Sequence, residues 1–251
     1  MKRWTVTLIG AALAACGPNK IGNNGDSGNP QNDGGGTCGA AFTCPNVTFD
    51  GGPLAYPACP YATTRGSVFP DYVLSSATIP GGGFFDTTMS PSQQTPNPDI
   101  PAQYAGNPQG APAFSGNVAL HMLHCAAASG YRYVLIDISS VWCPHCRDEA
   151  QQLPTTWVPQ WNQHGGIVFS VLEDGNTVNT PATVQDLNAW VSTYGSNYPV
   201  VLDPQETLVS GINLQAWPAN IIIDLRNMTV YDSMFGATFQ FFTEFDNLLK
   251  Q

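Results

Sequence analysis

Short apolar runs alternate with helical patterns along the C-terminal two-thirds of the chain. Residues 133–138 and 167–172 are such runs, rich in β-branched side chains, which is typical of buried strands. The expected strands are 66–74, 133–138, 167–172, 199–202, 219–224 and 229–231, and the expected helices are 117–129, 143–153, 184–193, 206–209 and 239–250. Pro154 and Pro159 are expected to break or kink the second helix. Strands that alternate with helices, then a hairpin and a closing helix, predict an α/β sandwich around a central mixed sheet.

The N-terminus has the pattern of a lipoprotein signal peptide. Residues 1–15 begin with basic residues, continue as a mostly apolar run and end in small residues directly before Cys16. This run is shorter than the about 20 apolar residues that a membrane span needs. Leu13-Ala14-Ala15-Cys16 resembles a bacterial lipobox, in which the cysteine becomes the lipidated N-terminus; the alternative is an ordinary signal peptide with a chance cysteine. Gly17 favours the outer membrane, facing the periplasm, because it is not the Asp of an inner-membrane retention signal.

Composition divides the rest of the chain into three parts. Residues 16–37 are almost all Gly, Asn, Asp, Pro, Ser and Gln, which predicts a flexible, disordered tether. Residues 38–65 hold three cysteines and several turn residues, which indicates a loop-rich cap. The folded domain is expected at 66–251, with a Pro- and Gly-rich insertion at about 75–116.

Charge excludes one class of partner. The formal net charge is −10, with 8 Lys and Arg against 18 Asp and Glu, and the sequence contains no basic run. Binding to a phosphate backbone needs clustered Lys and Arg side chains. A nucleic-acid partner is therefore not expected.

The seven cysteines fall into three groups. Cys16 is assigned to lipid, and Cys143 with Cys146 form a CxxC motif. The remaining four are expected to form two structural disulfides in an oxidising compartment: Cys38, Cys44, Cys59 and Cys125. Three pairings are possible and the sequence does not choose among them; the working hypothesis joins Cys38 to Cys44 and Cys59 to Cys125.

The CxxC motif follows a predicted strand and opens a predicted helix. A thiolate is the nucleophile in disulfide exchange, and the N–H groups at a helix N-terminus stabilise negative charge. Cys143 is thus placed to have a lowered pKa, and Cys146, one turn later, is placed to resolve a mixed disulfide. His145 could add positive charge or a hydrogen-bond donor, and Pro144 fits the first helical turn, where its missing N–H costs little.

Two other interpretations of the CxxC were weighed. A zinc site needs two more ligands at suitable spacing, and no second CxxC or CxxH is present. The nearest candidates are His121, His124 and Cys125, and no metal is expected. The CxxC could also be a purely structural disulfide.

Residues 134–154, VLIDISSVWCPHCRDEAQQLP, resemble the active site of the thioredoxin superfamily, and most closely its TlpA/ResA-like thiol–disulfide oxidoreductases. The resemblance covers about residues 66–251 and implies a thioredoxin-like fold. Asp137 stands where thioredoxins carry a buried acid, which implies a proton acceptor for Cys146; the alternative is an ordinary polar residue at a strand end. Trp142 precedes the nucleophile, as the family's tryptophan does, and would shield the dithiol.

Two further segments are in register with that family. Arg147 and Glu149 resemble its CRxE pattern, in which the Glu adjusts active-site protonation, although Gln151 replaces the next proline. Trp217 and Pro218 resemble the cis-proline loop beside the CxxC, which implies a cis bond at Pro218. Trp217 is bulky for this place and either contacts substrate or packs in the core. The Pro-His dipeptide between the cysteines is the one found in DsbA-like oxidants.

The expected function is thiol–disulfide exchange with protein substrates in the cell envelope, by a monomer without a cofactor and with a redox partner still to be identified. A peroxiredoxin-like peroxidase is one alternative: Ser140 meets its requirement three residues before Cys143, but Ile136 stands where its proline should be. A copper-delivery protein and a lipoprotein that only binds are the others.

Overall fold

The computed structural model describes residues 42–49, 52–78, 118–236 and 239–251. The expected signal peptide, the lipidation site Cys16, the tether, Cys38 and most of the expected insertion lie outside these residues.

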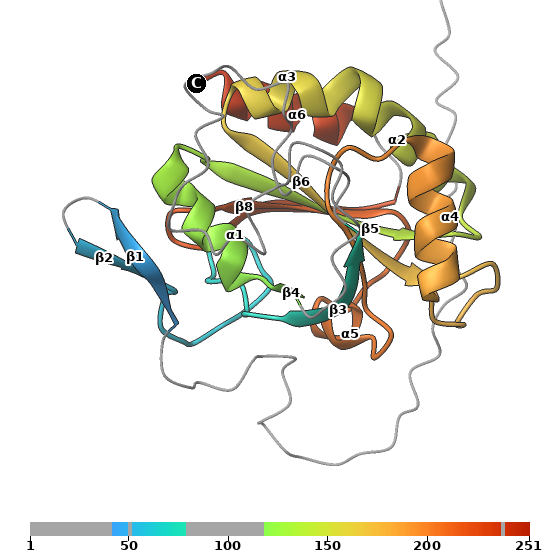
Figure 1. Cartoon of the computed structure of the whole chain (residues 1–251), viewed down its shortest axis with the longest axis horizontal. Helices are drawn as coiled ribbons and strands as arrows, with labels where there is room; N and C mark the ends of the chain where they lie inside the picture. The colour runs from blue at the N-terminus through green and yellow to red at the C-terminus, as the bar shows by residue number, and fades with distance from the viewer. Residues whose placement is uncertain (1–41, 50–51, 79–117, 237–238) are drawn as a thin grey trace, which may run out of the picture.

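A mixed sheet runs through the centre of the described chain (Figure 1), with seven strands in the order β4-β3-β7-β6-β5-β8-β9. Its central strands, β5 and β6, are parallel and buried along their whole length, which explains their apolar sequences. β7 continues the parallel part, and β8 and β9 extend the sheet antiparallel from β5. The strand bounds are Val73–Thr78 (β3), Val118–Ala119 (β4), Tyr133–Ser140 (β5), Gly166–Asp174 (β6), Val200–Leu202 (β7), Ala219–Asp224 (β8) and Thr229–Phe235 (β9).

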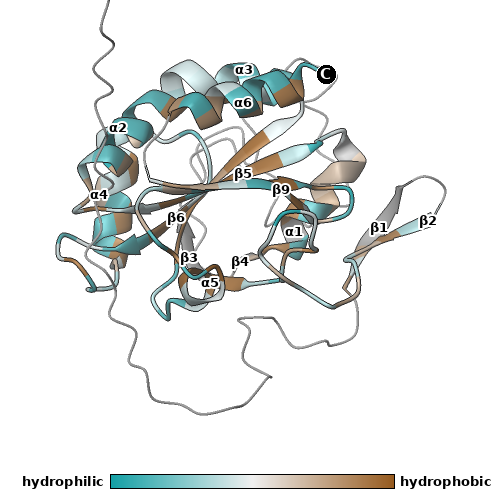
Figure 2. Ribbon diagram, turned by 180° about the vertical axis from the view of Figure 1, so that it is seen from behind, coloured by the Kyte–Doolittle hydropathy of each residue, from teal (hydrophilic) through white to brown (hydrophobic). Residues whose placement is uncertain are grey.

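Helices cover both faces of the sheet (Figures 1 and 2). α2, α3 and α6 lie on one face, and α1 and α5 lie on the other. Trp161 on α3 packs edge-on against Phe242 and Phe245 of α6, which closes the core on the first face. The helix bounds are His121–Cys125 (α1), Pro144–Gln152 (α2), Val158–Gln163 (α3), Val184–Tyr194 (α4), Thr207–Gly211 (α5) and Phe239–Leu249 (α6). None of the helices in the described ranges has the length and apolar character of a membrane span.

The helix after the CxxC continues further than its prolines predict. α2 ends at Gln152, but residues 153–157 form a π-helical turn that leads directly into α3. Pro159 has no N–H to donate to the carbonyl four residues earlier, and the wider turn is the local adjustment in this stretch.

The sequence predicts the first strand and the first helix less well. The strand expected at 66–74 lies at 73–78, and the helix expected at 117–129 is divided into β4, α1 and a 3₁₀ turn at Ala126–Ser129. The reason is tertiary pairing: β4 pairs with β3, and β3 pairs with β7 at the sheet edge. These partners are distant in sequence, so local periodicity does not reveal them.

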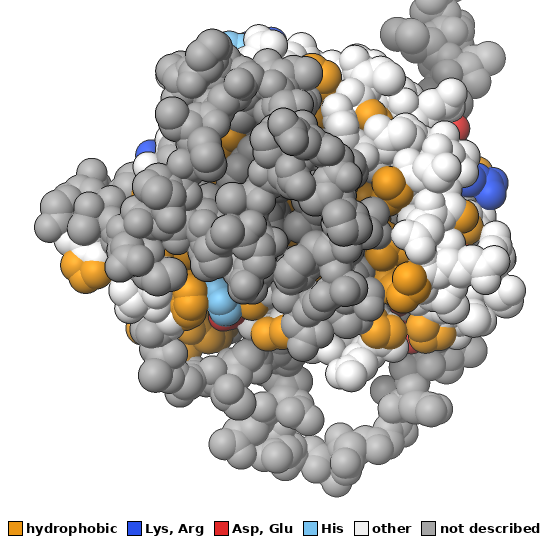
Figure 3. All heavy atoms as spheres, viewed as in Figure 1, with side chains coloured by type: hydrophobic (Ala, Val, Ile, Leu, Met, Phe, Trp, Pro, Cys, Tyr) orange, Lys and Arg blue, Asp and Glu red, His pale blue; other side chains and the backbone are white. Residues whose placement is uncertain are grey.

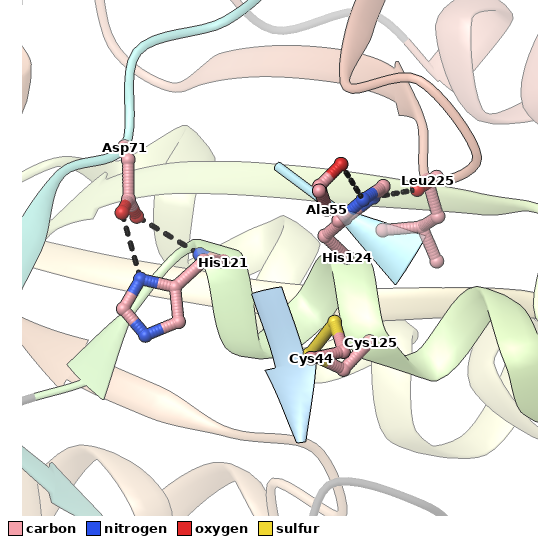
Figure 4. Close-up of a disulfide and its surroundings, with 7 residues drawn as sticks. All are labelled: Cys44, Ala55, Asp71, His121, His124, Cys125 and Leu225. Atoms are coloured by element: carbon pink, nitrogen blue, oxygen red, sulfur yellow. Dashed lines mark hydrogen bonds and ion pairs between the residues drawn. A yellow bond between two sulfur atoms is a disulfide. The ribbon is translucent and has the colours of Figure 1, made fainter. Parts of the chain in front are cut away.

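A separate antiparallel pair of strands precedes the sheet: β1 (Thr43–Phe49) and β2 (Gly52–Ala55), in the segment expected to be loop-rich. A disulfide joins Cys44 of β1 to Cys125 at the end of α1 (Figure 4). The working hypothesis for the disulfides is therefore wrong, because it joined Cys44 to Cys38 and Cys125 to Cys59. β1 lies against α1, which brings the two sulfur atoms together. Cys59 is also disulfide-bonded.

Two histidines of α1 strengthen this junction (Figure 4). The backbone N–H and the ring Nδ1 of His121 lie 2.9 and 2.7 Å from the Asp71 carboxylate. His124 is buried, with Nδ1 2.5 Å from the Leu225 carbonyl oxygen and Nε2 3.0 Å from that of Ala55. Both side chains are thus engaged in contacts that hold the N-terminal strands against the domain.

Candidate redox site

The CxxC lies where the central strand passes into α2. Cys143 is the N-cap of this helix, and its Sγ accepts a hydrogen bond from the Cys146 N–H at 3.3 Å. Pro144 occupies the first helical turn, as the sequence predicts. Cys143 and Cys146 are both free thiols and both buried, so a substrate sulfur reaches them only when neighbouring side chains move.

The two thiols have opposite acidities. A hydrogen bond from the Cys146 thiol, assisted by the N–H groups of Cys146 and His145 and opposed by burial, lowers the pKa of Cys143 below its ordinary 9.0. Burial raises the pKa of Cys146 well above 9.0, and its hydrogen bond to Cys143 adds to this effect. The pair therefore contains one readily formed thiolate and one retained thiol.

Asp137 lies in the middle of β5 and is completely buried. Its Oδ1 accepts a hydrogen bond from Ser139 Oγ at 2.9 Å, and its Oδ2 accepts one from Ser170 Oγ at 2.7 Å. Burial raises the pKa of Asp137 to about 6, and the two hydroxyl donors limit the rise.

A second buried carboxyl group, Glu149 of α2, faces the same region. Asn220 Nδ2 donates a hydrogen bond to Glu149 Oε2 at 3.1 Å. Burial raises the pKa of Glu149 well above its ordinary value, and the nearby charge of Asp137 adds to this effect. The site thus holds two coupled carboxyl groups behind the dithiol.

Two tryptophans flank the CxxC and pack edge-on, with ring centroids 5.5 Å apart. Trp142 Nε1 donates a hydrogen bond to Asp174 Oδ2 at 3.0 Å, and Trp217 Nε1 donates one to Glu173 Oε2 at 3.1 Å. Trp217 is buried, and its peptide bond to Pro218 is cis. The acidic end of β6 thus holds both aromatic rings in place.

The other predicted residues lie on the outer side of α2. His145 Nδ1 lies 3.7 Å from the Asp148 carboxylate. Arg147 is exposed, and its guanidinium donates to the Val141 carbonyl at 3.4 Å.

Sequence reasoning missed five polar side chains of this site. They share one signal, which is a polar residue inside or at the end of an otherwise apolar strand: Ser139, Ser170, Glu173, Asp174 and Asn220. Their partners depend on strand register, which the sequence does not give.

The histidines that were weighed as metal ligands lie elsewhere. His121 and His124 are on α1, on the opposite face of the sheet from α2 (Figure 1). Within the described ranges, no group of three or more His, Cys, Asp or Glu residues is arranged to hold a metal ion. Lys and Arg side chains among the described residues in Figure 3 are isolated rather than gathered into a patch.

Comparison with known proteins gives a family match. Residues 109–231 match the AhpC/TSA family. No curated protein matches the chain.

Solved structures show weaker likenesses. A Chlorobium tepidum protein described as a thiol:disulfide interchange protein DsbE is 17% identical with a TM-score of 0.48, and the match covers 74% of this chain and 97% of that one. A thiol:disulfide interchange protein from a Bacteroides species is 15% identical (TM-score 0.47; 75% and 91% covered), and peroxidoxin BcpB from Mycobacterium tuberculosis is 12% identical (TM-score 0.47; 75% and 97% covered). The strand order and the family match of residues 109–231 show that this chain has a thioredoxin-like α/β fold.

Proposed function

We propose that this protein is a thiol–disulfide oxidoreductase that exchanges disulfides with protein substrates through Cys143 and Cys146. The observation that carries the proposal is the pair of free thiols at the start of α2, with Cys143 Sγ accepting the Cys146 N–H. The lowered pKa of Cys143 and the raised pKa of Cys146 support a division into an attacking and a resolving thiol.

The reduction of a substrate disulfide then has two steps. The Cys143 thiolate attacks one substrate sulfur, the substrate S–S bond breaks, and the other substrate sulfur leaves as a thiolate. Cys146 next loses its proton to the Asp137 carboxylate and attacks Cys143 Sγ, which forms the Cys143–Cys146 bond and releases the second substrate thiolate. Two electrons pass from the dithiol to the substrate, and the reverse sequence oxidises a substrate dithiol.

The finer assignment is to the TlpA/ResA-like branch, with a DsbA-like Pro-His between the cysteines. Glu149, buried on α2, fits the branch's acidic residue that adjusts protonation. Trp142 and Trp217 with Pro218 form the wall beside the dithiol, and His145 stands next to the thiolate at the start of α2. The protein needs no cofactor for this reaction, because the electrons come from the dithiol itself.

We assign the reaction to the cell envelope. The pattern before Cys16 supports a lipid anchor facing the periplasm, at the outer membrane in a Gram-negative cell. The Cys44–Cys125 disulfide and the bonded Cys59 support an oxidising compartment. The protein would act as a monomer with its protein substrates and a separate redox partner.

Trapping of a mixed disulfide tests this function. The Cys146→Ser variant, mixed with a disulfide-bonded model substrate such as insulin, should accumulate a covalent complex through Cys143. The matched Cys143→Ser variant should not, because its remaining thiol is the less acidic one. Equal trapping by both variants, or by neither, would overturn the proposal.

The two alternatives predict different results in the same preparation. A peroxiredoxin-like peroxidase would consume hydrogen peroxide at a rate that depends on Cys143. A copper-delivery protein would bind copper tightly in the reduced form and would show no mixed disulfide.

A further inference from the structure

Asp137 occupies the centre of a polar row that crosses three strands. In the strand register Asp137 pairs with Ser170 of β6 on one side and with Asn220 of β8 on the other. Paired residues on neighbouring strands project from the same face of a sheet, as do residues two apart on one strand. Ser139, Ser170 and Asn220 therefore share a face with Asp137.

The two serines bind both oxygens of the Asp137 carboxyl group. Ser139 Oγ is 2.9 Å from Oδ1 and Ser170 Oγ is 2.7 Å from Oδ2, and all three residues are fully buried. An ionised carboxylate accepts both hydroxyl protons at once, whereas a carboxylic acid would use one oxygen as a donor. The arrangement fits the ionised form, and hydrogen bonds to a charged acceptor are the stronger kind.

The titratable groups around Asp137 carry no positive charge. Glu149 and Cys146 face it from α2, Cys143 from the start of that helix, and Tyr198 from the loop before β7. Each of these is neutral or negative, so the hydroxyl donors supply the stabilisation of an Asp137 charge.

The second carboxyl group is less well supplied with donors. Glu149 Oε2 accepts one amide N–H, from Asn220, and Oε1 has no hydrogen-bond partner among the described residues. Two nearby buried carboxyl groups cannot both ionise cheaply, so the group with fewer donors retains the proton.

We propose that Ser139 and Ser170 are positioning residues that keep Asp137 ionised, so that Glu149 holds the proton of the pair and Asp137 is free to accept the proton of Cys146. The last step, transfer from Cys146, rests on the proposed function. The placement of the proton between the two carboxyl groups does not.

Titration of the carboxyl carbons by NMR in the reduced protein tests the placement without a substrate. The resonances are assigned with Asp137→Asn and Glu149→Gln. Ser170→Ala and Ser139→Ala should each raise the midpoint of Asp137 by about one pH unit, because each removes one donor to the charged form. Ser170→Thr retains the hydroxyl and should restore the midpoint.

Ser140→Ala is the matched control. Ser140 is buried on the same strand, and its Oγ has no hydrogen-bond partner within the described part of the chain. Its replacement should leave the Asp137 midpoint unchanged. A midpoint that stays in place in both alanine variants, or a threonine variant that behaves like alanine, would overturn the inference.

The pH profile of disulfide release gives a second readout. The rate at which Cys146 displaces substrate from a mixed disulfide should rise through the Asp137 midpoint, and Ser170→Ala should move this rise upward by the same amount. Shifted carboxyl midpoints in a protein that traps no substrate would remove the proposed function and retain the proton placement. Substrate trapping with unshifted midpoints would do the reverse.

Discussion

Replacement of the buried Asp137 by Asn should stabilise the folded protein in a pH-dependent manner. The carboxyl group titrates at about 6 in the folded protein against an ordinary value of 3.8. Asn has nearly the same shape and can still accept from one serine and donate to the other. The variant therefore removes the buried charge while it keeps the packing of β5.

The magnitude follows from the two pKa values. A raised folded-state pKa means that the ionised form is disfavoured in the fold, and the gap between 3.8 and about 6 corresponds to about 3 kcal/mol. Below 3.8 the group is protonated in both states and costs nothing. Between the two values the folded chain holds the extra proton, so the wild type loses stability as pH rises, and above 6 the full cost applies.

Urea unfolding of the wild type and Asp137→Asn across this range measures the effect. The variant's advantage should be near zero below 3.8 and should level off at about 3 kcal/mol above 6. Asp148→Asn, which removes an exposed carboxylate from α2, controls for the loss of one negative charge. An advantage that does not change with pH, or a destabilised variant, would refute a buried charge at Asp137.

Two further predictions concern the cysteines. Ultraviolet absorbance of the thiolate should show that the reduced protein ionises one thiol below 9.0 and that Cys143→Ser loses this step; a first step that persists in the variant would assign it to another thiol. Replacement of Cys44 and Cys125 together by Ser should lower the free energy of unfolding by about 4 kcal/mol, because their disulfide closes a loop of 81 residues; a loss below about 1 kcal/mol in urea unfolding would contradict this.

The sequence predicts the parts of the fold that depend on local pattern. The strand at 219–224 has its predicted bounds, and 133–138 forms most of β5, because apolar runs at these positions are buried on both faces. The start of α2 is also predictable, since Cys143-Pro144 is a local signal for a helix N-terminus.

The parts that the sequence does not predict depend on tertiary pairing. The bond between Cys44 and Cys125 requires β1 to lie against α1, and spacing along the chain carries no information on that contact. In the same way Ser170 is an isolated polar residue in an apolar strand until the register of β5 and β6 places it opposite Asp137. Prediction of such a partner needs the alignment of strands, not only their existence.

Equilibration of the reduced protein with glutathione buffers tests the central claim most directly. The fraction of protein with a Cys143–Cys146 disulfide, measured by mass spectrometry after thiol alkylation, should follow a two-electron transition as the buffer becomes more oxidising. A protein that keeps both thiols free, or carries only glutathione on Cys143, would contradict a redox role for this pair.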